Sequence, residues 1–415
     1  MKTKIAAIVL AGTVASTLSG CATTEAEAST SPCGRLDTDL AWYGDNASRL
    51  QTLLDRDGHC GKKGPHPVAV FDWDNTVVKN DVGDATTFWL LRHDKVRQPA
   101  GGDWTTTSSL LTPAAAAALA SACGTAAPAG SALPTSTDTA CADEILSVYS
   151  DARTTSGQDA FAGWNRRRTE PAYAWAAQLL AGYTPDEVKD FASRARQENL
   201  DAPVGAEQTV GTHRVTGWIR YYDQQKDLIR ALGRSGFDVW ITSASQEDVV
   251  QVWAAGVDLP ADHVIGVRTR QENGKLTAAL AGCGGDDDTI PYIDGKRCVI
   301  NERILKVPSA KAFDIQPVNR RQAFAAGDSN TDVSFLRDAT ELRLVINRNK
   351  AELMCNAYDN ADGKWIVNPM FISPKAALTK PYPCSTSAFT NPDGSSGPVT
   401  TDGGRVVPDQ LDTVH

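Results

Sequence analysis

An alternation of helical and strand-like segments after residue 215 constrains the fold of this 415-residue chain more than any other feature. Helices are predicted for 34–57, 223–235, 246–255, 297–305 and 332–337, and apolar strands for 68–71, 237–242, 323–326 and 342–346. Strands and helices that alternate in this way predict an α/β fold, with a Rossmann-like, doubly wound parallel sheet covered by helices. Such sheets bind ligands at the carboxyl ends of their strands, which is where functional residues are expected.

The segment from 81 to 214 differs from the rest of the chain in composition. It contains an alanine run at 114–118, lacks a β-rich run, and has a capping box formed by Thr184 and Glu187. These features predict a mainly helical insert. A final stretch rich in Gly, Pro, Ser and Thr is typical of disorder. The predicted organisation is a core formed by 33–80 and 215–384, a helical insert at 81–214 and a disordered tail at 385–415.

The overall composition is that of a globular protein and argues against nucleic acid as a partner. Hydrophobic residues make up 41% of the chain and charged residues 22%, which excludes wholesale disorder. The 41 Lys and Arg residues are outnumbered by 50 Asp and Glu residues, so the net charge is −9. Phosphate backbones are bound by an excess of basic side chains, so no nucleic acid is expected as a partner.

The beginning of the chain resembles a bacterial lipoprotein signal peptide. A short basic start precedes the mostly apolar run 5–18, which is too short for a comfortable membrane span. Small residues then lead to Cys21, the expected site of lipid attachment once 1–20 is removed. A plain secretion signal with an incidental cysteine is the alternative. We expect an extracytoplasmic protein, anchored to the cell membrane by its lipid through a polar linker at 21–32.

The chain has nine cysteines, and the eight beyond Cys21 form an even number in an oxidising compartment, which predicts four disulfides. Sequence alone leaves many pairings open. Neighbours are expected to pair, because each pair would close a stretch rich in Gly, Ala, Ser or Asp. The expected pairs are Cys33–Cys60, Cys123–Cys141, Cys283–Cys298 and Cys355–Cys384. A zinc–thiolate site is the alternative, but the sequence has no CxxC or HExxH spacing.

The first predicted strand is followed by two carboxylates, Asp72 and Asp74, and by Thr76. Acids two residues apart share one face of an extended chain, and clustered carboxylates can bind Mg²⁺ or divide the roles of nucleophile and acid/base. Two solvated acids in a capped loop are the alternative. At the end of the strand 237–242, the hydroxyl groups of Thr242 and Ser243 suit either an anion or simple helix capping.

Two further groups follow in chain order. Gly295-Lys296 precedes a predicted helix, and a lysine there would screen the carboxylates and bind phosphate oxygens. Asp328 and Asp332 lie in a Gly-Asp-Ser-Asn-Thr-Asp run after the strand 323–326. Each group is a weak signal by itself, because surface lysines and Gly-Asp turns are common.

In this order the four groups resemble the four motifs of the haloacid dehalogenase (HAD) superfamily of phosphohydrolases, over about 66–80 and 215–372. The resemblance implies an Mg²⁺-dependent phosphomonoesterase with an aspartyl-phosphate intermediate, and it makes the insert the family's cap domain. The resemblance implies that Asp72 is the nucleophile and Asp74 the general acid/base. Phosphate binding is implied for Thr76, Lys296 and Ser243 (or Thr242). The implied metal ligands are Asp72, the Asp74 carbonyl and Asp328, and Asp332 would support the metal or the lysine.

The lysine is the least secure of these assignments. Lys306 and Lys311 lie closer to Asp328 in the sequence than Lys296 does. Lys296 is preferred because the apolar residues that follow it predict the expected helix.

Within the superfamily, the Asp-Asn-Thr start, the GDSNTD run, the export signal and the segment 365–369 are most similar to bacterial phosphorylcholine phosphatases, and next to phosphoserine phosphatases. A trimethylammonium head group is bound by aromatic faces and carboxylates. Asp81, Asp84 and Trp89 are therefore the candidate head-group residues, and small phosphomonoesters such as phosphocholine the candidate substrates. Helix capping by the two acids and core packing by the aromatic side chain are the alternatives.

Two other functions fit the same motifs. One is a phosphotransferase that passes the phosphoryl group from Asp72 to an acceptor alcohol. The other is a non-catalytic lipoprotein that captures phosphorylated solutes, although a pure binder has no need of both Asp72 and Asp74.

Overall fold

The computed structural model describes residues 33–61 and 64–415, and the predicted signal peptide, Cys21 and the linker 21–32 lie outside these residues. Its centre is a six-stranded sheet whose neighbouring strands are all parallel, in the order β12–β11–β10–β1–β6–β7. The strands are β1 (Val68–Phe71), β6 (Asp238–Gln246), β7 (Val264–Val267), β10 (Phe324–Gly327), β11 (Leu342–Asn347) and β12 (Trp365–Pro369). The predicted α/β class is confirmed.

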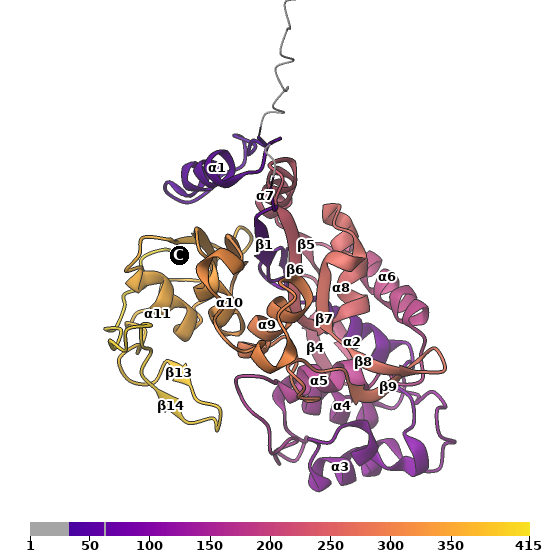
Figure 1. Ribbon diagram of the computed structural model, residues 1–415. Coiled ribbons are helices and arrows are strands. Elements are labelled where there is room, and N and C mark those ends of the chain that lie inside the picture. Colours follow the sequence, from indigo (N-terminus) through magenta and orange to yellow (C-terminus); the bar gives the residue numbers. More distant parts are fainter. Residues whose placement is uncertain (1–32, 62–63) are drawn as a thin grey trace, which may run out of the picture.

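Helices cover both faces of this sheet (Figure 1). Successive side chains of a strand point to opposite faces, so Phe71 of β1 packs with residues of α1, α7 and α8, whereas Val70 packs with residues of α10 and α11. The core helices are α1 (Asn46–Asp57), α7 (Asp223–Arg234) and α8 (Glu247–Ala254) on the first face, and α9 (Asp294–Val299), α10 (Val333–Asp338) and α11 (Ala351–Asp359) on the second. Because both faces are buried, the strands are apolar throughout.

A second lobe lies beyond the carboxyl ends of the strands, at the bottom of Figure 1. Of its helices, α3 (Pro113–Cys123), α4 (Thr139–Asp151) and α5 (Pro171–Gln178) lie there, whereas α2 (Val82–Arg92) and α6 (Pro185–Asp201) pack beside α8 and share the apolar cluster of the core. Trp104, Ile145 and Trp175 belong to its own apolar cluster. The lobe also has a hairpin of β3 (Glu207–Val210) and β4 (His213–Thr216). No sequence pattern indicates β3, since Val210 is its one buried residue and no apolar alternation marks the strand.

The helical lobe is joined to the core at several points. Where the chain leaves and re-enters the core, β2 (Val78–Lys79) pairs with β5 (Arg220–Tyr221). A hairpin of the core, β8 (Thr269–Glu272) and β9 (Lys275–Leu280), reaches the lobe through Leu276. The Leu276 amide donates to the Tyr183 carbonyl at 2.8 Å, and the Gly182 amide donates to the Leu276 carbonyl at 2.8 Å. The lobe is therefore joined to the core by backbone hydrogen bonds at this hairpin.

The buried Arg167 is a further tie between the lobe and the core. Its guanidinium donates to Asp294 of α9 at 3.1 Å, to Glu352 of α11 at 3.1 Å and to the Thr390 carbonyl at 3.1 Å. Burial raises the pKa of Glu352 to about 7, although Arg167 opposes the shift. One side chain thus joins the lobe, two core helices and the C-terminal segment.

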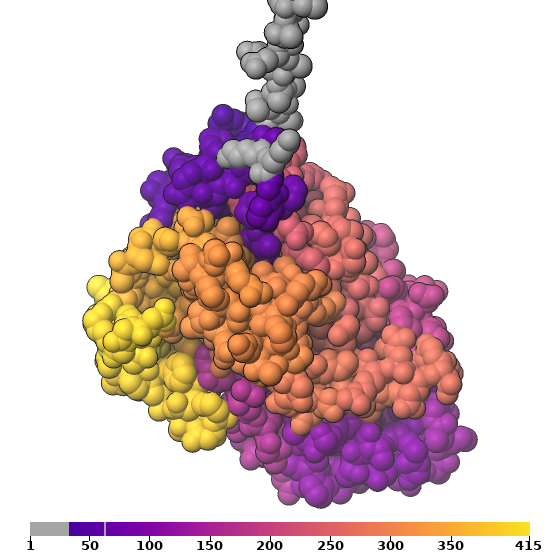
Figure 2. Space-filling model, in the orientation of Figure 1, coloured from indigo at the N-terminus to yellow at the C-terminus, as the bar shows by residue number. Residues whose placement is uncertain are grey.

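The expectation of disorder for 385–415 is wrong. Val399 and Val407 are 1% and 2% exposed and pack in one cluster with Tyr382 and Cys384. Short strands β13 (Phe389–Thr390) and β14 (Ser396–Gly397) pair in this segment, and Figure 2 shows the segment in yellow against the rest of the molecule. Its apolar residues are single and widely spaced, so no periodic pattern in the sequence marks them as buried.

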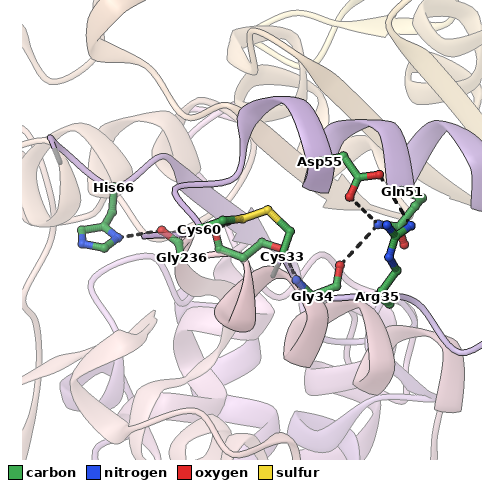
Figure 3. Close-up of a disulfide and its surroundings, with 9 residues drawn as sticks. Cys33, Gly34, Arg35, Gln51, Asp55, Cys60, His66 and Gly236 are labelled. Atoms are coloured by element: carbon green, nitrogen blue, oxygen red, sulfur yellow. Dashed lines mark hydrogen bonds and ion pairs between the residues drawn. A yellow bond between two sulfur atoms is a disulfide. The ribbon is translucent and has the colours of Figure 1, made fainter. Parts of the chain in front are cut away.

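All four predicted disulfides are confirmed: Cys33–Cys60, Cys123–Cys141, Cys283–Cys298 and Cys355–Cys384. The first is shown in Figure 3. It lies beside the turn that precedes β6, where the Gly34 amide donates to the Ser235 hydroxyl at 2.9 Å. A Cβ at Gly34 would lie 2.3 Å from the Ala231 carbonyl oxygen, so the chain can lie this close to α7 only with a glycine at this position. The helix expected from 34 onward accordingly begins only at Asn46.

None of the helices in 33–61 and 64–415 combines the length and the apolar character needed to cross a membrane.

The packing of the C-terminal segment can be tested with two neighbouring valines. Val407→Ala removes two buried methyl groups and is expected to lower the free energy of unfolding by about 1–2 kcal/mol. Val406 is 44% exposed, so Val406→Ala serves as the matched control and is expected to change stability by less than about 0.5 kcal/mol. Urea denaturation measures both variants. Equal effects of the two would contradict a packed segment.

Candidate active site

The sequence-predicted residues converge at the carboxyl edge of the sheet. Asp72 follows β1 directly, Asp328 follows β10, and Ser243 lies within β6. These strands are neighbours, because β1 pairs with both β10 and β6. Lys296 comes from α9, and Asp332 from the short helical turn before α10. Four segments distant in sequence therefore place their polar side chains in one region.

Lys296 lies between two carboxylates. Its Nζ is 2.5 Å from Asp72 Oδ1 and 2.6 Å from Asp332 Oδ1, and all three side chains are buried. Burial alone would lower the pKa of Lys296, but Asp332 and Asp72 raise it above its ordinary value. The lysine is therefore charged. Lys306 and Lys311 are exposed, which identifies Lys296 as the lysine of this cluster.

Asp332 is occupied by protein partners on both oxygens. Oδ2 accepts hydrogen bonds from the backbone amides of Asp328 and Ser329, at 2.9 and 3.0 Å, and Oδ1 accepts from Lys296. A Cβ at Gly327 would lie 2.6 Å from the Cβ of Asp332, so the end of β10 needs a glycine for this approach. Asp332 thus fixes the loop that carries Asp328 and holds the lysine.

The Thr76 hydroxyl lies between Asp72 and Asp328. Its Oγ1 is 3.0 Å from Asp72 Oδ2 and 3.0 Å from Asp328 Oδ1. Having one proton, it donates to one carboxylate at a time. Burial, followed by Asp328, raises the pKa of Asp72 to about 6, while Lys296 opposes that shift. The turn that brings Thr76 back over Asp72 needs a left-handed residue, Asn75, with φ of 61°.

Asp74 has a different environment from Asp72. It is half-buried, and its Oδ1 accepts from the Val82 amide at 2.8 Å. Its Oδ2 accepts from the hydroxyls of Ser243, at 3.2 Å, and Ser245, at 2.9 Å. Burial, then Asp81 and Asp72, raise the pKa of Asp74 well above its ordinary range. Two carboxylates held apart in this way suit different roles, one as nucleophile and one as proton donor.

The hydroxyl residues of β6 differ in their positions. Ser243 is buried and directed at Asp74. The Thr242 hydroxyl is also buried, and it has no hydrogen-bond partner among the described residues. Ser245, which sequence reasoning did not assign to the site, lines the pocket instead. The N-cap of α8 is Gln246, whose side chain accepts from the Val249 amide.

The carboxylates fit a divalent cation. Asp72, Asp328 and Asp332 each offer one oxygen, and these oxygens lie within 4.8 Å of one another in a buried group. Oxygen ligands of this kind suit Mg²⁺. All three carboxylates have protein partners on both oxygens, but those of Asp332 include two backbone amides that fix the loop, which leaves Asp72 and Asp328 as the better donors. The three carboxylates are paired with two cations, Lys296 and Arg348, so negative charge remains to attract a metal ion.

A pocket opens in front of these carboxylates, between the core and the helical lobe. Asp72, Asp74 and Asp328 line it together with apolar and aromatic residues of the lobe, among them Leu90, Ala176, Leu180, Tyr149 and Tyr173. Arg348, which follows β11, also lines it. The rule that ligands bind at strand ends could have found Arg348 in the sequence. No sequence signal marks Tyr149 and Tyr173 among the other aromatic residues of the lobe.

Of the three candidate head-group residues, two lie at the pocket. Asp81 caps α2 and lines the pocket. Asp84 lines an adjoining polar cavity that shares Asp81 and Tyr173, and its Oδ1 accepts from the Tyr149 hydroxyl at 2.7 Å. Burial, followed by Asp81, raises the pKa of Asp84 to about 7. Trp89 was assigned wrongly: it is buried in the core and its indole donates to Glu198.

Comparison with known proteins gives a local sequence similarity and a fold. No protein-family model matches the chain. Phosphorylcholine phosphatase of Pseudomonas aeruginosa is 30% identical over 117 residues, which cover 26% of this chain and 33% of that protein. The match thus spans about a third of that relative's length.

Among solved structures, a conserved protein of unknown function from Anaerococcus prevotii matches with a TM-score of 0.55 and 20% identity, over 80% of this chain and 93% of its own. A substrate-bound phosphoserine phosphatase matches at a TM-score of 0.31 and 12% identity, over 68% and 87%, which is too low a score to establish a common fold. The chain therefore shares its α/β fold with the Anaerococcus protein, and part of its sequence is similar to a phosphorylcholine phosphatase.

The buried lysine can be tested by neutralisation. Lys296→Met leaves Asp72 and Asp332 buried without their cation, so we expect a loss of about 3–5 kcal/mol in the free energy of unfolding. Lys306→Met and Lys311→Met, at exposed sites, are matched controls expected to change stability by less than about 0.5 kcal/mol. Urea denaturation followed by circular dichroism makes the comparison. A Lys296→Met variant as stable as the controls would refute the ion-pair geometry.

Proposed function

We propose that the protein is a HAD-type, Mg²⁺-dependent phosphomonoesterase that works through an aspartyl-phosphate. The observation that carries the proposal is the pair Asp72 and Asp74 at one pocket, with Lys296 on the nucleophile and a raised pKa on Asp74. The order of the four motifs and the local similarity to a phosphorylcholine phosphatase support it. A pure binding site has no use for a nucleophile next to an acid.

In the first half-reaction a carboxylate oxygen of Asp72 attacks phosphorus, and the bond from phosphorus to the ester oxygen breaks. Asp74, which retains a proton because of its raised pKa, gives that proton to the leaving alcohol. In the second half-reaction Asp74 takes a proton from water, the water oxygen bonds to phosphorus, and Asp72 is released. Inorganic phosphate and free alcohol are the products.

The other residues place and neutralise charge. Lys296 keeps Asp72 ionised and oriented, and Thr76 holds its second oxygen. Asp72, the Asp74 carbonyl and Asp328 would hold Mg²⁺, which supplies positive charge for the phosphate oxygens. Ser243 and Ser245 orient Asp74. Residues of the helical lobe form part of the pocket wall and reduce its exposure to bulk water, which strengthens each of these interactions.

The substrate that we propose is a small phosphomonoester with a cationic head group, phosphocholine being the candidate. Asp81 and Asp84 form no ion pair with any described residue, and the rings of Tyr149 and Tyr173 stand near them. A quaternary ammonium, which cannot donate hydrogen bonds, is bound by negative charge and aromatic faces. The residues that we propose for the head-group site are therefore Asp81, Asp84, Tyr149 and Tyr173, without Trp89.

We propose an extracytoplasmic location for this activity, with the lipid on Cys21 as its anchor. The four disulfides support an oxidising compartment.

The nucleophile can be tested with p-nitrophenyl phosphate. The wild-type protein is expected to hydrolyse it in the presence of Mg²⁺, and Asp72→Asn is expected to lower kcat by about 10³-fold or more, because the amide cannot form the phosphoenzyme. Asp74→Asn should retain phosphoenzyme formation with this good leaving group but slow its hydrolysis, seen as a burst. Asp190→Asn, at an exposed site of α6, is the control. Full activity of Asp72→Asn would refute the mechanism.

The head-group site can be tested by pairing substrates with one variant. Wild-type protein is expected to prefer phosphocholine to phosphoethanolamine and phosphoserine. Asp84→Asn, assayed at about pH 8 where Asp84 is ionised, should lower kcat/KM for phosphocholine about tenfold and leave p-nitrophenyl phosphate nearly unchanged. An equal loss on both substrates would remove Asp84 from head-group recognition. No preference among the three substrates would discard phosphocholine.

A further inference from the structure

Asp328, the second predicted ligand of the divalent cation, already has a cationic partner in the chain. Arg348 Nη1 is 2.6 Å from Asp328 Oδ2. The two residues directly follow β11 and β10, which are adjacent parallel strands with Gly327 opposite Val345. The pairing is therefore built into the sheet, because both side chains leave the same edge side by side.

The arginine in this pair is fixed in charge and open to the pocket. Burial alone would lower the pKa of Arg348, but Asp328 raises it, so the guanidinium remains protonated. Its side chain is 28% exposed, whereas that of Asp328 is 1% exposed. Arg348 lines the substrate pocket and the adjoining polar cavity, together with Asp81 and Tyr173.

Each carboxylate of the candidate metal site thus has a neutralising group. Lys296 serves Asp72 and Asp332, while Arg348 serves Asp328. A buried carboxylate without a counter-ion is costly, so Arg348 stabilises Asp328 when no metal is present. The same positive charge repels a divalent cation that approaches the same carboxylate. Stability without metal and affinity for metal are therefore opposed at this residue.

We propose that Arg348 is a positioning residue that acts as an internal counter-ion of Asp328 and weakens the binding of Mg²⁺ there. The inference rests on the metal site of the proposed function. It predicts that Mg²⁺ and the guanidinium of Arg348 both interact with Asp328 and that the guanidinium lowers the affinity for Mg²⁺. Removal of the arginine charge should therefore tighten Mg²⁺ binding. Recognition of the substrate phosphate by Arg348 is the rival role.

Mg²⁺ titration by calorimetry, without substrate, tests the inference. Arg348→Met keeps an unbranched side chain and removes its charge, and its Kd for Mg²⁺ is expected to be about tenfold lower than that of the wild type. Arg348→Lys keeps the charge and is expected to stay within about twofold. If Arg348→Met does not fold, Arg348→Gln takes its place with the same expectation. The matched control is Arg343→Met, because Arg343 lies in β11, is paired with Asp362 and lines neither the pocket nor the adjoining polar cavity.

Thermal unfolding supplies a second readout. Without Mg²⁺, Arg348→Met should melt below the wild type, and saturating Mg²⁺ should raise its Tm more than it raises that of the wild type. Arg343→Met should also melt at a lower temperature, but Mg²⁺ should raise its Tm by as much as it raises that of the wild type.

The inference is overturned, and the proposed function left intact, if the wild type binds Mg²⁺ and Arg348→Met binds it no more tightly. A higher KM for substrate in Arg348→Met, with an unchanged affinity for Mg²⁺, would also overturn the inference and would assign Arg348 to binding of the substrate phosphate. Absence of Mg²⁺ binding by the wild type would overturn both.

Discussion

The charge of Lys296, enclosed between Asp72 and Asp332, is the interaction on which the rest of the site depends. These three ionised side chains are fully or nearly buried, and such a group is stable only when the surrounding residues fix the positions of the charges. The start of α9 shows how firmly it is held. Ile293 has φ of 48°, a conformation rarely adopted by a β-branched residue, and it is fixed by hydrogen bonds to Thr331 and Ser334. The strained turn aims the helix so that its lysine reaches the carboxylates.

The residues that sequence reasoning located are those fixed by strand ends. Asp72 and Asp328 could be paired from the sequence because parallel neighbours bring their carboxyl ends to one edge. Trp89 could not be placed, since an amphipathic helix offers the same pattern whether an aromatic side chain faces a pocket or the core. The C-terminal segment could not be predicted either, because Val399 and Val407 are buried by long-range contacts with Tyr382. Arg348 satisfied the strand-end rule, but an isolated arginine carries no motif.

The helical lobe does more than cover the pocket, because it is tied to the elements that position the chemistry. Arg167 bonds to Asp294, two residues before Lys296, and to Glu352 at the start of α11. Through the Thr390 carbonyl it also holds the C-terminal segment. Any displacement of the lobe at this point must break a buried ion pair or carry α9 with it.

The Cys33–Cys60 disulfide fixes the place at which the proposed tether would enter the folded domain. The bridge lies beside the turn between α7 and β6, at the amino edge of the sheet (Figure 3), whereas Asp72 and Asp328 follow the carboxyl ends of β1 and β10. A tether entering at Cys33 would pull on a covalently closed corner and leave the loops that carry Asp72 and Asp328 unstrained. It would also direct the mouth of the pocket away from the anchoring surface. Diffusing solutes would then reach the pocket from the open side, and bulky material on the surface would not obstruct their approach.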